Sequence, residues 1–439
     1  MIGQFPWDPF PPGEPDPKGP DPVPSLAYRA AVSAADAYHA VRLAVRREGG
    51  TLRVGNRFVP EGRYREVAFL AFGNAANSMA LGVLHALGQQ LTQGFLAGPE
   101  PVTDEVPFRG LTVAPGWPGD PVAESVVRSA VELAEGLTEQ DLLLVLLSPG
   151  ALKALATPPV GMTPAEFAGF LERAHTAGAD GREVALLARV VGTGAVGGRL
   201  AAAVTRADLA TLVVERGDGT PVLGGGPTRR VTPEERAEAR AVVERVGLAS
   251  ALPATASAPL APGSGSEAPA RAVRPVVVAT PSDALRAASE SLFDKGWTVR
   301  LASLQLREDA ETAATRFVEL SEELYRRESL TPESRTKGVV TFAMATLGLP
   351  EGLDEGPALG RFLTRARDLL RRREMSVGLF RTGGDTTGTR EYPPGAVVGA
   401  PTDPDARVPR ERARAVRMRR GITDVGSLAV AVYPRPVSS

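Results

Sequence analysis

A glycine-rich motif is the first candidate for chemistry. Residues 190–200 read VVGTGAVGGRL and place glycines at Gly192, Gly194 and Gly197. In a dinucleotide site, such glycines let the backbone approach a pyrophosphate at a helix N-terminus, and an acidic residue about twenty positions later binds the ribose. Glu215 stands near that distance. However, the residues before Gly192 have the pattern of a helix end, and a chain with 47 glycines produces such spacings often. The pattern therefore favours a plain turn over an NAD(P) site.

Three loops that follow apolar strands are the second candidate. They are GNAANSM at 73–79, SPG at 148–150, and the segment 217–228. Open α/β sheets bind ligands at the carboxyl ends of their parallel strands, because helix N-termini converge there. The sequence therefore predicts a small-molecule site at one edge of a parallel sheet.

The order of these motifs resembles that of the two-domain glycerate 2-kinases. Gly-x-Ala-Ala-x-x-Met after a strand is followed by Asp-Leu-x-Leu-x-Leu-Leu-Ser-x-Gly, then by Gly-Gly-Arg-Leu-Ala, and then by Gly-Asp and Gly-Pro-Thr at a similar spacing. The resemblance spans about residues 25–433 and includes Thr-Gly-Gly-Asp at 382–385. It implies ATP- and magnesium-dependent phosphoryl transfer to the 2-hydroxyl of glycerate, in a cleft between the two domains.

The resemblance also implies roles for individual positions. The substrate-binding positions are Asn74, Ser148, Gly150 and Arg189. The nucleotide-binding positions are Gly217, Asp218, Gly226 and Thr228. Asp385 is the candidate magnesium ligand.

Several positions depart from the family pattern. Asn74 stands where these kinases carry a lysine, and Pro149 removes one amide donor from a loop whose backbone cradles an anion. Val214 stands where an aspartate is expected, and Trp117 stands where a histidine is expected. Phosphoryl transfer depends on positioning and charge neutralisation, so these changes remove groups that would carry the rate.

Three charged residues are candidates for a rebuilt catalytic site: Lys153, Arg189 and Asp385. Lys153 is one of only four lysines and follows the Ser148 loop, at the expected start of a helix. From there its ammonium could reach a phosphate. The alternatives are a solvated helix residue for Lys153 and a turn-forming aspartate for Asp385.

Composition excludes several classes of protein. The 439 residues include 50 Lys and Arg, 51 Asp and Glu, and no Cys, with a net charge of −1. Without a positive excess we expect no nucleic-acid or membrane partner. Without Cys there are no disulfides, and the three histidines have no metal-ligand spacing. The arginine-rich segments 361–373 and 410–420 are more typical of solvated faces than of polyanion sites.

Hydrophobic patterning predicts two α/β domains. Mainly apolar runs without alternation at 66–72, 141–147 and 209–214 are typical of parallel strands covered on both faces. A helix is predicted over 25–47, and Thr163, Pro164 and Glu166 predict a capped helix start. Later, a strand at 275–279, a helix at 282–294 and a strand at 297–301 predict a parallel crossover.

These elements suggest four segments. Residues 1–24 form a Pro-rich tail, 25–248 a Rossmann-like N-terminal α/β domain with a parallel sheet, 249–272 a flexible linker or loop, and 273–439 a smaller α/β C-terminal domain. The tail lacks the features of a secretory signal, so a cytoplasmic location is expected. It is also a candidate binding segment for a protein partner.

Three functions remain open at this level. The first is an ATP- and magnesium-dependent kinase of glycerate or a related small hydroxy acid. The second is a catalytically degenerate member of the family that serves in binding or assembly. The third is an NAD(P)-dependent oxidoreductase. The sequence does not predict the oligomeric state.

Overall fold

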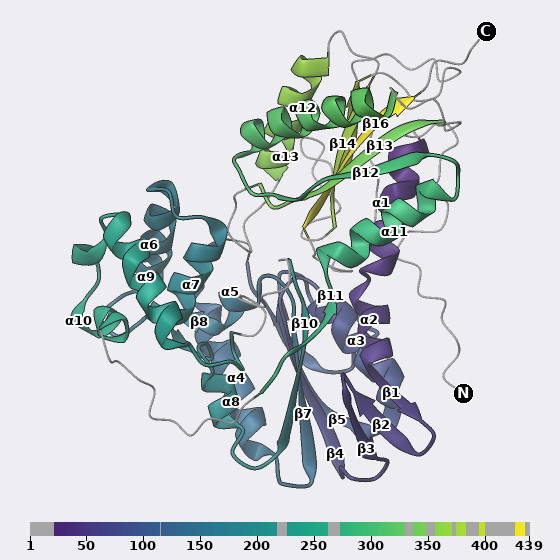
Figure 1. Ribbon diagram of the computed structural model, residues 1–439. Coiled ribbons are helices and arrows are strands. Elements are labelled where there is room, and N and C mark those ends of the chain that lie inside the picture. Colours follow the sequence, from purple (N-terminus) through teal and green to yellow (C-terminus); the bar gives the residue numbers. More distant parts are fainter. Residues whose placement is uncertain are drawn as a thin grey trace. The chain divides into compact units, whose positions relative to one another are not determined.

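The computed structural model divides into two units. The six-stranded unit comprises residues 37–279 with 350–353, and the five-stranded unit comprises residues 1–36, 280–349 and 354–439. The structure describes residues 22–114, 116–216, 226–261, 273–329, 337–347, 356–370, 375–382, 395–399 and 426–434. Helices and strands of both units appear in Figure 1.

A parallel sheet forms the centre of the six-stranded unit (Figure 1). Its strands, in spatial order, are β11 (Val276–Ala279), β10 (Asp208–Val214), β7 (Asp141–Leu147), β4 (Glu66–Phe72), β5 (Leu91–Gly98) and β6 (Arg109–Thr112). Every neighbouring pair is parallel. All seven residues of β7 are buried, because the sheet is covered on both faces. The predicted strands 66–72 and 141–147 are confirmed.

Helices surround this sheet, and two small sheets lie beside it. The longer helices are α2 (Ala37–Ala44), α3 (Ala76–Leu87), α4 (Val122–Gly136), α6 (Pro164–Thr176), α7 (Gly181–Val191) and α9 (Pro233–Arg245). The short ones are α5 (Ala151–Leu155), α8 (Arg199–Ala203), α10 (Ala254–Ser257), η1 (Gly88–Gln90), η2 (Ala249–Ala251) and η3 (Ala258–Leu260). The antiparallel strands are β1 (Val45–Glu48), β2 (Thr51–Val54) and β3 (Arg57–Pro60), with β8 (Ala156–Thr157) pairing β9 (Thr193–Gly194).

Local sequence determines where the capped helices begin. The hydroxyl of Thr163 accepts a hydrogen bond from the backbone of Glu166, whose carboxylate in turn accepts one from the backbone of Thr163, as predicted. Thr232 and Glu235 form the same capping box at α9. The capping glutamate of α9 has a second role in the site described below.

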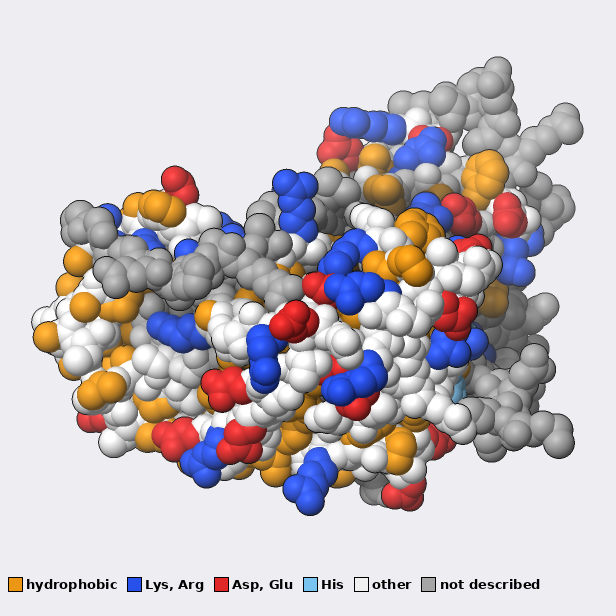
Figure 2. Space-filling model, turned by 90° about the horizontal axis from the view of Figure 1, so that it is seen from below, with side chains coloured by type: hydrophobic (Ala, Val, Ile, Leu, Met, Phe, Trp, Pro, Cys, Tyr) orange, Lys and Arg blue, Asp and Glu red, His pale blue; other side chains and the backbone are white. Residues whose placement is uncertain are grey.

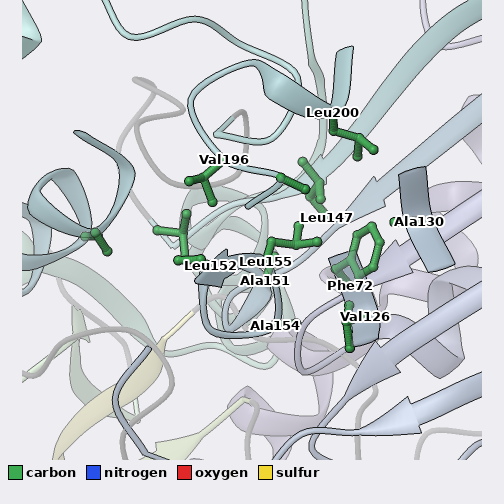
Figure 3. Close-up of a cluster of buried hydrophobic side chains, with 14 of the residues drawn as sticks. Phe72, Val126, Ala130, Leu147, Ala151, Leu152, Ala154, Leu155, Val196 and Leu200 are labelled. Carbon is green, nitrogen blue, oxygen red and sulfur yellow. The ribbon is translucent and has the colours of Figure 1, made fainter. Parts of the chain in front are cut away.

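The core of the six-stranded unit joins the sheet to helices α4 and α5 (Figure 3). Phe72 and Leu147, at the ends of adjacent strands, belong to the same buried cluster as Val126 of α4 and Leu155 of α5. Each of these side chains is fully buried. The turn between β7 and α5 is therefore anchored on both sides by apolar contacts, which position the residues that follow Leu147.

The five-stranded unit contains a mixed sheet. Its strands, in spatial order, are β12 (Thr298–Leu306), β13 (Gly338–Ala345), β16 (Ser427–Pro434), β14 (Ser376–Arg381) and β15 (Gly395–Gly399). Only the β12–β13 pair is parallel. Its helices are α1 (Pro22–Ala34), α11 (Pro281–Phe293), α12 (Ala310–Ser329) and α13 (Gly356–Leu370).

The structure differs from the sequence-based organisation at the N-terminus. The helix predicted over 25–47 is divided into α1, α2 and the start of β1. Helix α1 belongs to the five-stranded unit, where the ring of Tyr28 stacks on Phe380 and its hydroxyl donates a hydrogen bond of 2.7 Å to the carbonyl of Arg381. These contacts cross more than 350 residues, so local patterning carries no signal for them.

Two further predictions are wrong in part. Strand β11 pairs with β10 while β12 pairs with β13, so the predicted crossover does not lie in one sheet. The residues at 249–260, predicted as part of a linker, form η2, α10 and η3, with Ala256 and Leu260 buried in the core cluster. The segment is rich in Ala, Pro and Ser, a composition that is typical of linkers, although here it is packed.

Within the described segments, no helix is both long and apolar enough to cross a membrane.

Candidate functional site

Two turns join at the carboxyl edge of the six-stranded sheet. The backbone amide of Asn74, after β4, donates a hydrogen bond of 2.7 Å to the carbonyl of Pro149, after β7. Gly73 adopts a φ of +103°, and a Cβ there would lie 2.3 Å from the carbonyl oxygen of Ser148. Glycine is therefore required for the close approach of the turns. The structure thus brings together three predicted substrate-binding residues, Asn74, Ser148 and Gly150.

The hydroxyl of Ser148 is used to hold these turns together. It donates to the carbonyl of Phe72 at 3.1 Å and accepts from the backbone amide of Ala75 at 2.9 Å. The residue is 1% exposed. Ser148 therefore fixes the geometry of the edge and does not present its hydroxyl to solvent.

The side chain of Asn74 lies over Gly150. A Cβ at Gly150, which has a φ of +91°, would lie 2.8 Å from the Asn74 Oδ1. Asn74 is partly exposed, in contrast to its buried neighbour Ser148. It therefore presents a neutral amide at the position where the family pattern places a cation.

Arg189 lies in a buried ion pair. Its guanidinium donates two hydrogen bonds to the Glu235 carboxylate, at 3.2 and 3.4 Å, and its side chain has no exposed area. Arg229 also pairs with Glu235. Burial lowers the pKa of Arg189, against the effect of the Glu235 charge. Burial raises the pKa of Glu235, but Arg189 and Arg229 outweigh it and hold that pKa below its ordinary value.

The predicted nucleotide positions are only partly described. A Cβ at Gly226 would lie 3.1 Å from the Arg189 Cδ, and the Gly226 carbonyl accepts a hydrogen bond of 3.0 Å from the amide of Gly198. The buried hydroxyl of Thr228 accepts one of 2.9 Å from Thr211. Arg189 and Gly226 are therefore neighbours. Gly217, Asp218 and Asp385 lie outside the described residues.

Lys153 has the most unusual environment of the candidates. It lies on α5 and is 5% exposed, and its ammonium has no hydrogen-bond partner among the residues that the structure describes. Nζ lies 3.7 Å from the place that a Cβ of Gly116 would occupy. Burial lowers the pKa of Lys153 from 10.5 to about 8, and the charge of Asp120 acts in the opposite direction. Lys153 is thus a buried cation and not a solvated helix residue.

The glycine motif has a structural explanation. Gly192 follows helix α7, whereas a dinucleotide-binding motif requires a strand at that point. A Cβ at Gly192 would lie 2.4 Å from the Ala188 carbonyl oxygen, and one at Gly194 would lie 2.6 Å from that of Leu155. Close packing therefore requires both glycines. The strand–turn–helix arrangement of an NAD(P) site is absent from this described segment.

The described carboxylates do not form a metal centre. In the parts of the chain that the structure describes, no three His, Asp or Glu residues are grouped closely enough to hold a metal ion. Lysines and arginines are interspersed with acidic side chains on the face drawn in Figure 2. Asp385 lies outside the described parts and remains a sequence-based prediction for magnesium binding.

The five-stranded unit contains a concavity lined mainly by residues of α13. Its volume is about 560 Å³, and Arg361 and Arg365 line it together with Glu311 and Asp368. The guanidinium of Arg365 donates a hydrogen bond of 3.0 Å to Thr315. Because charges of both signs line this concavity, it has no net preference for an anion.

Two acidic residues that act on the candidate side chains carry no signal of this in the sequence. Glu235 is 46 positions from Arg189, and Asp120 is 33 positions before Lys153. The Thr-Pro-Glu-Glu sequence at 232–235 signals a helix start and so places Glu235, but it does not identify the arginine that it binds.

The chain belongs to the family described as "Domain of unknown function (DUF4147)", whose model matches residues 25–261. Among curated proteins, it is 28% identical over 231 residues to the glycerate kinase of Bos taurus, covering 49% of this chain and 43% of that protein. It is 27% identical over 246 residues to the glycerate kinase of Danio rerio, covering 52% and 48%. The matched region spans less than half the length of these relatives.

Solved structures extend the similarity of fold to both units. The PH0495 protein from Pyrococcus horikoshii OT3 matches with a TM-score of 0.65 and 17% identity, over 94% of this chain and 98% of that one. The glycerate kinase from Thermotoga maritima matches with a TM-score of 0.64 and 18% identity, over 94% and 100%. The fold is therefore that of the glycerate kinases, as the resemblance in the sequence predicted.

Proposed function

We propose that this protein is a glycerate kinase-like phosphotransferase that acts on glycerate or a related small hydroxy acid. The observation that carries the proposal is the joined pair of turns at the carboxyl edge of the parallel sheet, followed three residues later by the buried cation of Lys153. Similarity to proteins named glycerate kinases supports the choice of reaction.

The residues of the edge have separate roles in this proposal. Asn74 offers an amide to the hydroxy acid, Gly150 leaves room for that amide, and Ser148 holds the two turns in register. Arg189 is neutralised by Glu235, so we assign it to positioning of the Gly226 turn. A substrate carboxylate or phosphate then depends on Lys153 for a full positive charge.

ATP and magnesium belong to the proposal through the resemblance to the family. Gly217, Asp218, Gly226 and Thr228 are the proposed nucleotide contacts, and Asp385 is the proposed magnesium ligand. When bound, magnesium would neutralise phosphate charge. A carboxylate such as that of Asp385 is the type of ligand that magnesium prefers. The described carboxylates form no cluster that could hold the ion, so no step is assigned to it.

A second candidate function is binding without catalysis. Three observations favour it: the Ser148 hydroxyl is bonded internally, the Arg189 guanidinium is paired with Glu235, and Asn74 is neutral. Such a protein would keep the scaffold and bind a nucleotide, a hydroxy acid or a protein partner. Residues 1–24 are the proposed contact for a protein partner.

Two experiments together separate these candidates. The first is calorimetric titration with ATP and magnesium, with and without D-glycerate. The second is an assay for ADP release over a panel of small hydroxy acids. Saturable nucleotide binding with turnover supports the kinase. Saturable binding without turnover on any acid supports the second candidate. Absence of heat at millimolar nucleotide would overturn the kinase proposal.

A pair of matched variants tests the place of the site. Asn74→Asp introduces a negative charge at the edge and is expected to raise the KM for the acid at least tenfold. Asn56→Asp makes the same change at an exposed position of the β2–β3 turn and is expected to leave KM unchanged. Equal effects of the two substitutions would remove Asn74 from the site.

A further inference from the structure

Lys153 is a buried ion that no described group contacts through a hydrogen bond or an ion pair. In the described part of the chain its ammonium has no hydrogen-bond partner, and only 5% of the residue is exposed. An unpaired charge in a protein interior is strongly unfavourable, and methionine or leucine would fill the same space without that cost. The retention of a cation here therefore requires a reason other than packing.

We propose that Lys153 anchors a binding site for one oxyanion group, a carboxylate or a phosphate, of a small ligand that enters beside Gly116. This inference rests on the proposed function and deepens it, because it names the residue of this chain that replaces the lost positive charge. The site lies on α5, which follows directly from the joined turns of the sheet edge.

Gly116 lies beside the ammonium and, because it has no side chain, leaves space next to it. It adopts a φ of +144°, which favours glycine, and a Cβ there would lie only 3.7 Å from Nζ. Any longer side chain at this position would extend over the ammonium. At the preceding position of α5, Leu152 instead lies toward Gly226, with its Cδ2 3.3 Å from the place of a Gly226 Cβ. The two residues thus face different parts of the unit.

Asp120 does not serve as the counter-ion. Its charge acts on Lys153 at a distance and raises the pKa of the ammonium, but no hydrogen bond or ion pair joins the two groups among the described residues. The Asp120 carboxylate accepts a hydrogen bond of 2.8 Å from the amide of Val122 at the start of α4. It is therefore engaged in ordering that helix, and the ammonium remains available to a ligand.

The scarcity of lysine makes a direct test possible. Only Lys18, Lys153, Lys295 and Lys337 occur in the chain, so protein labelled with ¹³C and ¹⁵N at lysine gives four side-chain signals by NMR. The signal lost in Lys153→Met is that of Lys153. Its pKa is then measured in the free protein and with inorganic phosphate, D-glycerate or chloride.

We expect saturating phosphate or D-glycerate to raise the pKa of Lys153 by at least one, and the signals of the exposed Lys295 and Lys337 to stay unchanged. A response to phosphate alone identifies a phosphate as the ligand group, and a response to D-glycerate alone identifies the carboxylate. Absence of a response to both, or an equal response to chloride, overturns the inference.

Affinity provides the second measurement. Lys153→Met is expected to weaken binding of the responding anion about tenfold or more, because charge-assisted hydrogen bonds are the strong ones. Lys153→Arg, which retains the charge, should bind more tightly than Lys153→Met, and Lys295→Met should match the wild type. Unchanged affinity in folded Lys153→Met contradicts the proposal.

Failure of the oxyanion site and failure of the proposed kinase function give different results. A Lys153 signal that responds to the anion in a protein without turnover supports the oxyanion site and removes the kinase. Full turnover with an unresponsive Lys153 signal supports the kinase and removes the oxyanion site. A thermal melt of each variant excludes unfolding as the cause of lost binding.

Discussion

Replacement of Lys153 by methionine is expected to stabilise the free protein. The substitution removes a buried ammonium that has no hydrogen-bond partner within the described segments, while methionine fills a similar volume with an unbranched apolar chain. Most core substitutions destabilise, so a gain would be a specific signature of an unsatisfied charge. The same substitution should weaken anion binding, as described above.

The expected size follows from the pKa of Lys153. Burial lowers this pKa from 10.5 to about 8, and each pKa unit corresponds to about 1.4 kcal/mol. The charged form of Lys153 therefore lowers the free energy of unfolding by about 3 kcal/mol at pH 7. Lys153→Met should recover most of this difference.

The effect has a definite dependence on pH. Below pH 8, Lys153 is protonated in both the folded and the unfolded chain, so the full cost is present. Between pH 8 and 10.5 the folded chain loses the proton while the unfolded chain keeps it, and the stability of the wild type therefore rises with pH. The difference in stability between Lys153→Met and the wild type should thus be greatest below pH 8 and disappear near pH 10.5.

Hydrogen–deuterium exchange of peptides from β7 measures this effect, because β7 is completely buried in the six-stranded unit. Lys295→Met is the matched control, since Lys295 is exposed in the five-stranded unit, and should change stability by less than about 0.5 kcal/mol. The reasoning fails if Lys153→Met is no more stable than the wild type at pH 7, or if its stability rises above pH 8 as much as that of the wild type. Either result would mean that the folded chain compensates the charge of the ammonium.

Three other substitutions test individual contacts. Arg189→Met should destabilise the six-stranded unit by about 2 kcal/mol or more, because it removes one of the two arginines that neutralise the partly buried Glu235. A double variant with Glu235→Leu should recover part of this loss in the exchange assay. Tyr28→Phe should lower the stability of the five-stranded unit by about 1 kcal/mol through loss of the hydrogen bond to Arg381, and an unchanged melting temperature would contradict this. Ser148→Ala should cost about 1–3 kcal/mol by leaving a backbone amide unpaired, so a neutral result in urea unfolding would show that water replaces the hydroxyl.

The central strands and the capped helices were predictable from the sequence. Strands β4 and β7 have the predicted bounds, because each contains six consecutive apolar residues, a run of the length typical of a strand buried on both faces. The start of α6 at Thr163 was predictable because capping depends on residues three positions apart. In each case the determining interactions are local.

The candidate site was predictable only in part. Asn74, Ser148 and Gly150 were expected to meet because they follow neighbouring strands, and the structure places them together. The environment of Lys153 was not predictable: a lysine in a short helix usually points into water, and its burial depends on the Gly116 loop, which is 37 positions earlier. The partner of Arg189 was equally hidden.

The sequence by itself determined the central strands, the capped helix starts, the order of the turns that follow the strands and the resemblance to glycerate kinases. Tertiary structure alone decided that α1 joins the five-stranded unit, that β11 and β12 enter different sheets, and that Lys153 is a buried cation. The physical reason is that an apolar pattern records whether a side chain leaves water, but not which distant surface covers it. Charge is subject to the same limit, because the free energy of an ion depends on the neighbours that folding brings to it.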